Sequence, residues 1–371
     1  MAVVRALSHP GAVRPLDSRL PTVDQSLRDD NGFTSVMGMS FIWTNVANGV
    51  GEIILDRPKA LNALDQSMID EMYQTLLTWG DDESIGTVLV TSAHERAFCA
   101  GGDIRAIRQH ALDGEPEAIE TYFTAEYRLD QLVAEYPKPY VALIDGAAMG
   151  GGLGISVHGE IRVVTENALI AMPEKAIGFF PDIGATYFLP RLPEGVGLWL
   201  GLTGARLDGA DAVAVGLATH YVMAADLPAL ADHIRAGVSL GEALRPRSAA
   251  VESDLPLRRI AEYFSDSDIN ALVGGLQGAV GDDWAQEMLG LLGNASPTSL
   301  WVTAALLEAG RTSSLAECLD RELRVGARVC ATPDFAEGVR AVLVDKDRSP
   351  SFTPATIDAV DPAEVRRLVG D

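Results

Sequence analysis

Glycines and carboxylates in two nearby segments supply the chemical groups of a site that acts on acyl carbonyls. Residues 149–154 read Met-Gly-Gly-Gly-Leu-Gly, and residues 172–182 read Met-Pro-Glu-Lys-Ala-Ile-Gly-Phe-Phe-Pro-Asp. Consecutive glycines let bare backbone N–H groups approach a ligand closely. The later segment adds Glu174 and Asp182 beside apolar side chains. N–H donors stabilise a developing negative charge, and a neighbouring carboxyl group can act as acid or base.

A second glycine pair strengthens this interpretation. Gly102 follows a predicted strand and precedes Asp103, a residue type that often caps the start of a helix. Gly151 stands in a similar position, at the start of a predicted helix that runs to His158. N–H groups from both places, aimed at one oxygen, form an oxyanion hole in which one donor is worth on the order of 3 kcal/mol of barrier. Glycine pairs also serve tight turns and close packing, and the residues alone leave both interpretations open.

The surroundings of Glu174 and Asp182 distinguish them from ordinary loop carboxylates, which are solvated or cap a helix. The apolar neighbours in sequence are Ala171, Met172, Ile177, Phe179 and Phe180. Burial favours the protonated form of a carboxyl group and makes it a usable acid or base near neutral pH. Glu126, on a predicted helix, is a third candidate, whose alternative is an ordinary polar residue of that helix.

Ser156 and His158 raise the alternative of serine hydrolysis, because they directly follow the glycines. Residues 154–158 read Gly-Ile-Ser-Val-His and lack the second glycine of the Gly-x-Ser-x-Gly elbow. Two residues apart on a helix, the two side chains face different directions. We expect no serine triad here. The glycine run also lacks the lysine of a phosphate-binding loop and a complete dinucleotide fingerprint.

Strands and helices alternate around these residues. Residues 51–55, 87–91 and 139–144 are apolar runs typical of buried strands. A helix is predicted from near Asp65, and its apolar face consists of Met68, Ile69, Met72, Leu76 and Leu77. The pattern predicts an α/β core.

The strand pattern ends near residue 205. Apolar residues then recur at helical spacing over 229–236, 284–292 and 300–307. We predict an α/β catalytic core over residues 39–204 and a helical C-terminal region over residues 205–371. Residues 1–38 lack sustained apolar periodicity and are predicted to form a poorly ordered extension.

Composition excludes several classes of function. The chain has 371 residues, of which 47% are hydrophobic, so it can bury a large core. Its formal net charge of -23 repels a phosphate backbone, and we expect no nucleic-acid partner. No apolar run approaches the roughly 20 residues of a membrane span, and no secretory signal opens the chain. We expect no membrane association and a cytoplasmic location.

Cysteine and histidine usage argues against a metal centre. Three cysteines, far apart in sequence, are too few for a disulfide framework or a zinc site. The six histidines show no His-x-x-x-His spacing, so we expect no metal. An acidic protein can still hold a phosphorylated small molecule where a few cations gather. Arg57, Lys59 and Arg105 are the candidates.

Three segments, taken together, resemble the enoyl-CoA hydratase/isomerase (crotonase) superfamily. They are residues 55–64 (LDRPKALNAL), 97–104 (AFCAGGDI) and 150–152 (GGG). Within that superfamily, residues 172–182 and 334–347 resemble the 3-hydroxyisobutyryl-CoA hydrolase branch. The likeness covers nearly everything from residue 40 to 360. It implies a crotonase-like ββα spiral core followed by the helical C-terminal region.

Carried over residue by residue, the resemblance implies roles for five positions. The oxyanion hole falls on the backbone N–H groups of Gly102 and Gly151. The catalytic glutamate falls on Glu174, the carboxylate that contacts the acyl hydroxyl falls on Asp182, and a further substrate contact falls on Glu126. Each position carries the residue type that the resemblance requires.

Three further residues complete the predicted substrate-binding set. They are Asp103, beside the first glycine pair, and the cations Lys59 and Arg105. The resemblance departs from the hydratases at Gly154, near which those enzymes place a second catalytic glutamate. Water addition to a double bond requires two carboxylates around one water, so this departure disfavours it.

The resemblance therefore implies hydrolysis of the thioester of 3-hydroxyisobutyryl-CoA, or of 3-hydroxypropionyl-CoA, to free CoA and the hydroxy acid, in valine breakdown. The enzymatic alternatives are a Δ3,Δ2-enoyl-CoA isomerase and an enoyl-CoA hydratase. The alternative from another class is a non-catalytic acyl-CoA-binding protein, since a fold alone does not establish activity. No cofactor is expected beyond the coenzyme A of the substrate. Crotonase relatives commonly form trimers, and the sequence leaves both a homo-oligomer and a monomer open.

Overall fold

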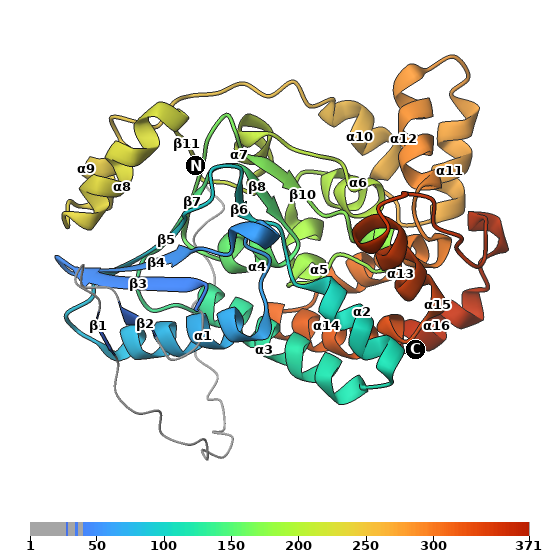
Figure 1. The fold of residues 1–371 in the computed structure, drawn as a ribbon. Coiled ribbons are helices and arrows are strands. Elements are labelled where there is room, and N and C mark those ends of the chain that lie inside the picture. The colour runs from blue at the N-terminus through green and yellow to red at the C-terminus, as the bar shows by residue number, and fades with distance from the viewer. Residues whose placement is uncertain (1–26, 29–33, 36–39, 371) are drawn as a thin grey trace.

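The computed structural model describes residues 27–28, 34–35 and 40–370, and it describes side chains within residues 40–370. The predicted extension over residues 1–38 lies outside the described residues, apart from two short strands, β1 (Leu27–Arg28) and β2 (Thr34–Ser35). In Figure 1 the strands gather on the left of the molecule and most C-terminal helices on the right.

Two sheets form the core. The larger has the strand order β1-β2-β3-β4-β5-β7-β9-β11, antiparallel from β1 to β4 and parallel from β4 to β11. The smaller has the order β10-β8-β6 and is parallel throughout. The bounds are β3 (Ile42–Ala47), β4 (Val50–Leu55), β5 (Thr87–Ser92), β6 (Ala97–Cys99), β7 (Tyr140–Ile144), β8 (Ala147–Met149), β9 (Ile161–Val164), β10 (Leu169–Ala171) and β11 (His220–Tyr221). The three strands predicted from sequence are β4, β5 and β7.

The chain passes repeatedly from the larger sheet to the smaller one and then into a helical segment. The first passage is β5, β6 and then the helices α2 (Ile104–Asp113) and α3 (Pro116–Ala134). The second is β7, β8 and α4 (Gly151–Val157). The third is β9, β10 and the 3₁₀ turn η2 (Glu174–Ile177). This is the ββα spiral expected from the sequence. Carboxyl ends of parallel strands meet at one edge of a sheet. The small sheet therefore brings Gly102, Gly151 and Glu174 to the same place.

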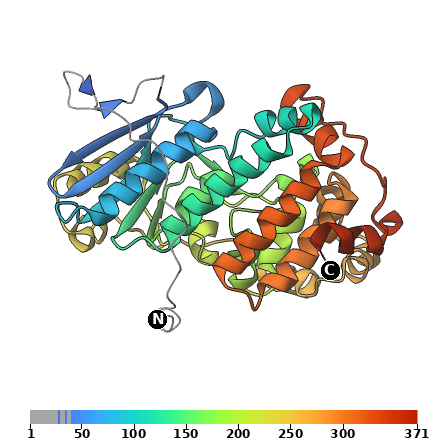
Figure 2. The same cartoon turned by 90° about the horizontal axis from the view of Figure 1, so that it is seen from below.

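Helices α1 (Gln66–Asp81) and α3 run side by side across one face of the larger sheet (Figure 2). α1 begins as predicted, because the carboxylate of Asp65 accepts from the N–H of Met68 at 3.0 Å. The predicted apolar face is wrong at Leu77, which is 40% exposed, whereas Trp79 is buried. Residue 79 lies three positions after Leu76 and seven after Met72, so it falls on their side of the helix.

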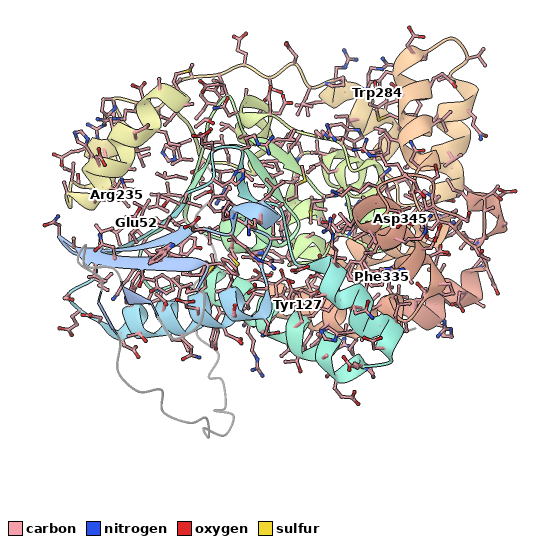
Figure 3. All side chains as sticks on the ribbon, viewed as in Figure 1. Glu52, Tyr127, Arg235, Trp284, Phe335 and Asp345 are labelled. Carbon is pink, nitrogen blue, oxygen red and sulfur yellow. The ribbon has the colours of Figure 1, made fainter. Side chains whose placement is uncertain are left out.

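The opposite face of the larger sheet is covered by residues that follow position 204. The helices are α8 (Leu227–Arg235) and α9 (Leu240–Leu244), and their buried side chains pack on those of β4, β5, β7 and β9. Figure 3 shows Arg235 and Glu52 side by side, where the guanidinium donates to both carboxylate oxygens at 2.7 and 2.9 Å. A buried carboxylate needs such a partner. The strand β11 was not expected from the sequence, because it extends the larger sheet from within the region predicted to be helical.

Most of the remaining helices lie in the right half of Figure 1. Their bounds are α5 (Ala185–Phe188), α6 (Val196–Thr203), α7 (Gly209–Val215), α10 (Leu257–Phe264), α11 (Ile269–Gly278), α12 (Asp283–Gly293), α13 (Pro297–Gly310), α14 (Leu315–Cys330), α15 (Pro333–Val339), the π-helical turn η5 (Arg340–Val344) and α16 (Pro362–Val369). The predicted helical windows fall on α8, α12 and α13. The division of the chain at residue 204 stays a prediction. Within the described part of the chain, no helix has the length and apolar character needed to cross a membrane.

Candidate active site

One cavity of about 820 Å³ contains every residue that the sequence analysis placed in the site. It opens at the edge where the strands of the small sheet end, and part of its wall comes from the C-terminal helical region. The predicted residues that line it are Lys59, Gly102, Asp103, Arg105, Glu126, Gly151, Glu174 and Asp182. Their gathering is a structural finding, whereas their roles stay predictions.

The N–H groups of Gly102 and Gly151 lie beside each other and are free to receive a ligand. Leu64 bridges the first glycine segment by donating to Gly101 and accepting from Asp103, both at 2.8 Å, which leaves the N–H of Gly102 unused. Gly151 is the first residue of α4, where an N–H has no partner within the helix. Among the described residues, no hydrogen bond is donated by either N–H.

Position 151 leaves little room for a side chain. A methyl group on its Cα would lie 2.3 Å from Oε1 of Glu126 and 3.2 Å from the nitrogen of Gly102. The first distance is a collision. The second shows that the two N–H groups are near neighbours, as an oxyanion hole demands.

Glu174 enters the cavity as the first residue of η2. Its side chain is buried, and its Oε2 has no hydrogen-bond partner among the described residues. Burial, reinforced by the negative charge of Asp182, raises the pKa of Glu174 well above the ordinary value. A methyl group on Gly150 would lie 3.1 Å from Oε1 of Glu174, so this carboxyl group borders the glycine segment that supplies one N–H donor.

The C-terminal helical region fixes the turn that carries Glu174. Lys175 is buried, and its ammonium group donates to the carbonyl of Leu291 in α12. Its carbonyl accepts from the N–H of Ser296 at 3.1 Å. A methyl group on Gly178, which has a φ of 70°, would lie 2.4 Å from the carbonyl oxygen of Asp334. Backbone therefore packs directly on backbone on both sides of η2.

Asp182 lies at the buried end of the cavity and is held by Tyr127 of α3. The phenolic hydroxyl donates to Oδ2 of Asp182 at 2.7 Å. Burial raises the pKa of Asp182 to about 7, although the hydrogen bond from Tyr127 opposes this rise. Within the described part of the chain, no second side chain donates to this carboxyl group. Asp182 can therefore accept one more hydrogen bond from a ligand.

Glu126 belongs to a group of buried carboxyl groups around the cavity. It is 2% exposed, and its Oε1 is unpartnered within the described residues. Burial and the charge of Asp182 raise its pKa well above the ordinary value. Asp130, one turn further along α3, is buried with both oxygens unpartnered, and burial raises its pKa strongly as well. Burial also raises the pKa of Glu322 to about 8, although three hydrogen bonds from Gly184 and Thr186 support it.

The opposite end of the cavity is exposed and positively charged. Lys59, Arg105 and Lys346 line it, and all three are exposed. Asp103 occupies the N-cap position of α2 but makes no capping bond, because its carboxylate accepts from Arg57 at 2.8 Å. The cavity thus runs from a cationic rim, defined by Lys59, Arg105 and Lys346, to a buried end lined by carboxyl groups.

Several residues that line this cavity were not expected from the sequence, and neither was Tyr127, which binds Asp182 without lining the cavity itself. No local sequence pattern identifies Tyr127 as a site residue, because Asp182, its hydrogen-bond partner, is 55 residues away in the chain. Val342, Leu343 and Lys346 lie within residues 334–347, a segment that had drawn notice for resemblance but had received no role. Among the described residues, no group of three His, Cys, Asp or Glu side chains is arranged to hold a metal ion.

Ser156 and His158 have structural roles, as expected. The Ser156 hydroxyl donates to the carbonyl of Gly152 at 2.8 Å, one turn earlier in α4. Nε2 of His158 lies 2.8 Å from the carbonyl oxygen of Ile183. Burial lowers the pKa of His158 to about 4, so this ring is neutral. Neither residue lines the cavity.

Comparison with known proteins agrees with this fold. The family model described as enoyl-CoA hydratase/isomerase matches residues 50–369. The chain therefore belongs to the enoyl-CoA hydratase/isomerase family. A protein of Xenopus tropicalis named 3-hydroxyisobutyryl-CoA hydrolase, mitochondrial, is 42% identical over 328 residues, which cover 85% of this chain and 84% of that protein. The human protein of the same name is 41% identical over 325 residues, covering 84% and 83%.

A solved structure extends the comparison to three dimensions. A crystal structure of an enoyl-CoA hydratase from Rhodobacter sphaeroides superimposes with a TM-score of 0.83 and 37% identity, covering 89% of this chain and 97% of that chain. Both the predicted α/β class and the spiral core are confirmed.

Proposed function

We propose that this protein hydrolyses the thioester of 3-hydroxyisobutyryl-CoA to free CoA and the hydroxy acid. One observation carries the proposal: a single cavity joins a pair of free N–H donors and a buried glutamate to a second buried carboxyl group, Asp182, that can still accept a hydrogen bond. The names of the relatives from Xenopus tropicalis and human support it. We also propose, from the family resemblance of the sequence, that the reaction belongs to valine breakdown.

The two ends of the cavity match the two ends of such a substrate. Phosphate groups of coenzyme A suit the exposed cationic rim of Lys59, Arg105 and Lys346, because cations near solvent attract anions even on an acidic protein. The acyl group then reaches the buried end near Glu174 and Asp182. Asp103, also at the rim, keeps Arg57 in place through their 2.8 Å ion pair.

Catalysis begins when the thioester carbonyl oxygen accepts from the N–H groups of Gly102 and Gly151, which stabilise negative charge as it develops. Glu174, in its ionised form, then either activates a water molecule as general base or attacks the carbonyl carbon itself. Either attack is followed by cleavage of the carbon–sulfur bond, which releases the CoA thiolate to take up a proton, and the second route leaves a mixed anhydride that water opens. A single turnover in H₂¹⁸O tests the second route, because water that opens the anhydride at the protein carbonyl places the label in Glu174.

Asp182 gives the site its preference for a hydroxyacyl group, because its ionised carboxylate accepts a hydrogen bond from the 3-hydroxyl. A site built to pair a hydroxyl rejects analogues that lack it far more strongly than a pocket rejects a missing methyl group. The methyl group that distinguishes 3-hydroxyisobutyryl-CoA from 3-hydroxypropionyl-CoA is worth only about 1–3 kcal/mol, so we propose that both are substrates. Glu126 contacts the substrate beside Gly151.

Enoyl-CoA hydration is a second candidate, and one observation favours it. Glu126 and Glu174 both line the cavity, so two carboxyl groups are available to one water molecule. The position that carries a second glutamate in hydratases offers no such group here. A methyl group on Gly154 would lie 2.5 Å from Oδ1 of Asp130, so any side chain there collides with α3. Hydrolysis remains the function that the cavity supports best.

Cofactor requirement, oligomeric state and cellular compartment each have a direct test. We propose that turnover needs no cofactor, which is tested by undiminished activity after dialysis against a chelator. A homo-oligomer is tested by light scattering on the eluted protein. All three cysteines are unpaired and buried, which fits a reducing compartment such as the cytoplasm. The relatives from Xenopus tropicalis and human are named as mitochondrial proteins. Fractionation of the source cells therefore decides between the cytoplasm and the mitochondrion.

The decisive assay measures free thiol released from (S)-3-hydroxyisobutyryl-CoA, beside crotonyl-CoA and a 3-enoyl-CoA. We expect rapid release from the hydroxyacyl ester alone. Loss of conjugated-enoyl absorbance from crotonyl-CoA without thiol release identifies a hydratase, and a gain of that absorbance from the 3-enoyl ester identifies an isomerase. Tight binding of all esters without any change contradicts an enzymatic role altogether.

A further inference from the structure

The C-terminal rim segment, residues 340–347, carries part of the active-site wall although it lies far along the chain from the catalytic residues. It consists of η5 and the turn that follows. Val342, Leu343 and Lys346 of this segment line the cavity. Figure 3 shows its Asp345 in the helical half of the molecule, on the same side as Phe335 of α15.

The helix that precedes the segment is fixed against the catalytic core. A methyl group on Gly338 would lie 2.4 Å from the carbonyl carbon of Ile177, so α15 touches η2 backbone to backbone. Arg108 of α2 donates to the carbonyl of Ala336 at 2.8 Å. α15 is therefore held by both the turn that carries Glu174 and the helix that follows Gly102.

Arg340 ties together the acidic residues of the segment. Its Nε and one terminal nitrogen donate to the two oxygens of Glu337, each at 2.8 Å. The other terminal nitrogen donates to Asp345 and to Asp347, each at 2.7 Å. A lysine has no planar fork and cannot reproduce this set of bonds.

These bonds determine the surroundings of Lys346. Asp345 and Asp347 flank it in sequence, yet both carboxylates bind Arg340, and among the described residues no acid pairs with Lys346. Lys346 also has a φ of 60°, a left-handed conformation that non-glycine residues adopt only when their surroundings enforce it. Arg340 thus both holds the turn and keeps the neighbouring acids away from the ammonium group.

We propose that Arg340 is a positioning residue for substrate binding. By engaging Asp345 and Asp347, it presents the free ammonium group of Lys346 to a phosphate of the coenzyme A nucleotide, while Val342 and Leu343 contact the pantetheine arm. This inference rests on the proposed function only in taking a coenzyme A ester as the ligand. It assigns a role to residues 334–347, which the sequence analysis left without one.

Binding of coenzyme A tests the proposal without any turnover. Calorimetry on the full chain would compare coenzyme A with pantetheine, which lacks the nucleotide phosphates. We expect Lys346→Gln to weaken coenzyme A binding about 2- to 5-fold, the range for an exposed ion pair, and to leave pantetheine binding unchanged. We expect the affinity of the wild type for coenzyme A to fall more steeply with salt than that of the variant.

Arg340→Gln is expected to reproduce the effect of Lys346→Gln, and the double variant is expected to bind no more weakly than Lys346→Gln alone. Such non-additivity is the signature of one residue acting through another. If Arg340→Gln does not fold, Arg340→Lys replaces it in the same binding measurement, because lysine keeps the positive charge but cannot make the same set of hydrogen bonds. Arg311→Gln breaks a comparable ion pair, with Glu308 at 2.7 Å, outside the cavity, and serves as the matched control that leaves binding unchanged.

Three results overturn the proposal: unchanged coenzyme A binding in both Arg340 variants, additive losses in the double variant, or an equal loss of pantetheine binding. Failure of the proposed function looks different. If the binding pattern appears as expected while no ester releases thiol, the positioning role stands and the hydrolase proposal falls.

Discussion

The phenolic hydroxyl of Tyr127 donates to Oδ2 of Asp182 across 2.7 Å, joining the middle of α3 to the loop that follows η2. Both side chains are buried. The hydrogen bond favours the ionised carboxylate, while burial disfavours it more strongly and raises the pKa of Asp182 to about 7. The group proposed to recognise the substrate hydroxyl therefore titrates at neutral pH.

Tyr127→Phe is expected to move this titration upward, because the carboxylate loses a donor that lowers its pKa. Preference for the hydroxyacyl ester over an unsubstituted acyl ester, measured as the ratio of kcat/KM values, should rise in the wild type as the pH passes through about 7. In the variant the same rise should occur at higher pH. Tyr73→Phe removes a hydroxyl outside the cavity and should leave the profile in place. Coincident profiles for all three proteins would show that Asp182 does not control the preference.

Glu174→Gln is expected to reduce thiol release at least 100-fold, since the amide can neither accept a proton nor attack the carbonyl. The melting temperature should stay equal or rise, because the change removes a buried carboxyl group whose Oε2 has no partner among the described residues. Glu194→Gln, at an exposed position, controls for the substitution itself. Retention of more than about a tenth of the activity contradicts a catalytic role for Glu174.

Gly151→Ala should lose both activity and stability, because the added methyl group meets Oε1 of Glu126 at 2.3 Å. Displacement of one N–H donor of the oxyanion hole typically costs about 10²- to 10³-fold in kcat. Gly290→Ala provides the matched control. Residue 290 lies inside α12 with open space around its Cα, so this alanine should leave activity unchanged and stabilise the helix by up to about 1 kcal/mol. Wild-type kcat in Gly151→Ala, measured by thiol release, would exclude Gly151 from the oxyanion hole.

Asp130→Asn should flatten the pH dependence of stability. Burial raises the pKa of Asp130 far above its ordinary value, so the folded state holds a proton that the unfolded state releases above about pH 4. The stabilising contribution is complete below that pH and declines as the pH rises toward the pKa of the folded state, by at most about 1.4 kcal/mol per pH unit. Urea unfolding of the wild type should therefore give a free energy that falls with rising pH, and the variant a smaller fall.

Asp320→Asn is the control for this series, because it makes the same substitution at an exposed position on α14. Its unfolding free energy should follow that of the wild type. Parallel curves for Asp130→Asn and the wild type would mean that Asp130 is ionised in the folded protein.

Local patterns in the sequence were sufficient for three strands of the larger sheet and for the residue types of the candidate site. The strands β4, β5 and β7 are apolar runs buried on both faces, a pattern that periodicity recognises directly. Gly102 was recognised after a predicted strand and loop, Gly151 at the start of a predicted helix, and Glu174 by its apolar neighbours in sequence. Their segments also resemble a known superfamily. Each of these signals lies within a few residues of the position that it identifies.

Only the tertiary structure decided how distant residues meet. It paired Tyr127 with Asp182 and placed the Asp103 carboxylate on Arg57 in place of the expected helix cap. It also brought Lys346 to the cavity, 192 residues after Gly154 (346 − 154). Packing also buried Trp79 in place of Leu77 and paired β11 with β9 at the end of the larger sheet. These outcomes depend on which surfaces pack together, because burial, charge pairing and the approach of one backbone to another are set by neighbours in space. Sequence determined the groups that can do the chemistry, and packing of the C-terminal helices against η2 determined the cavity in which they act.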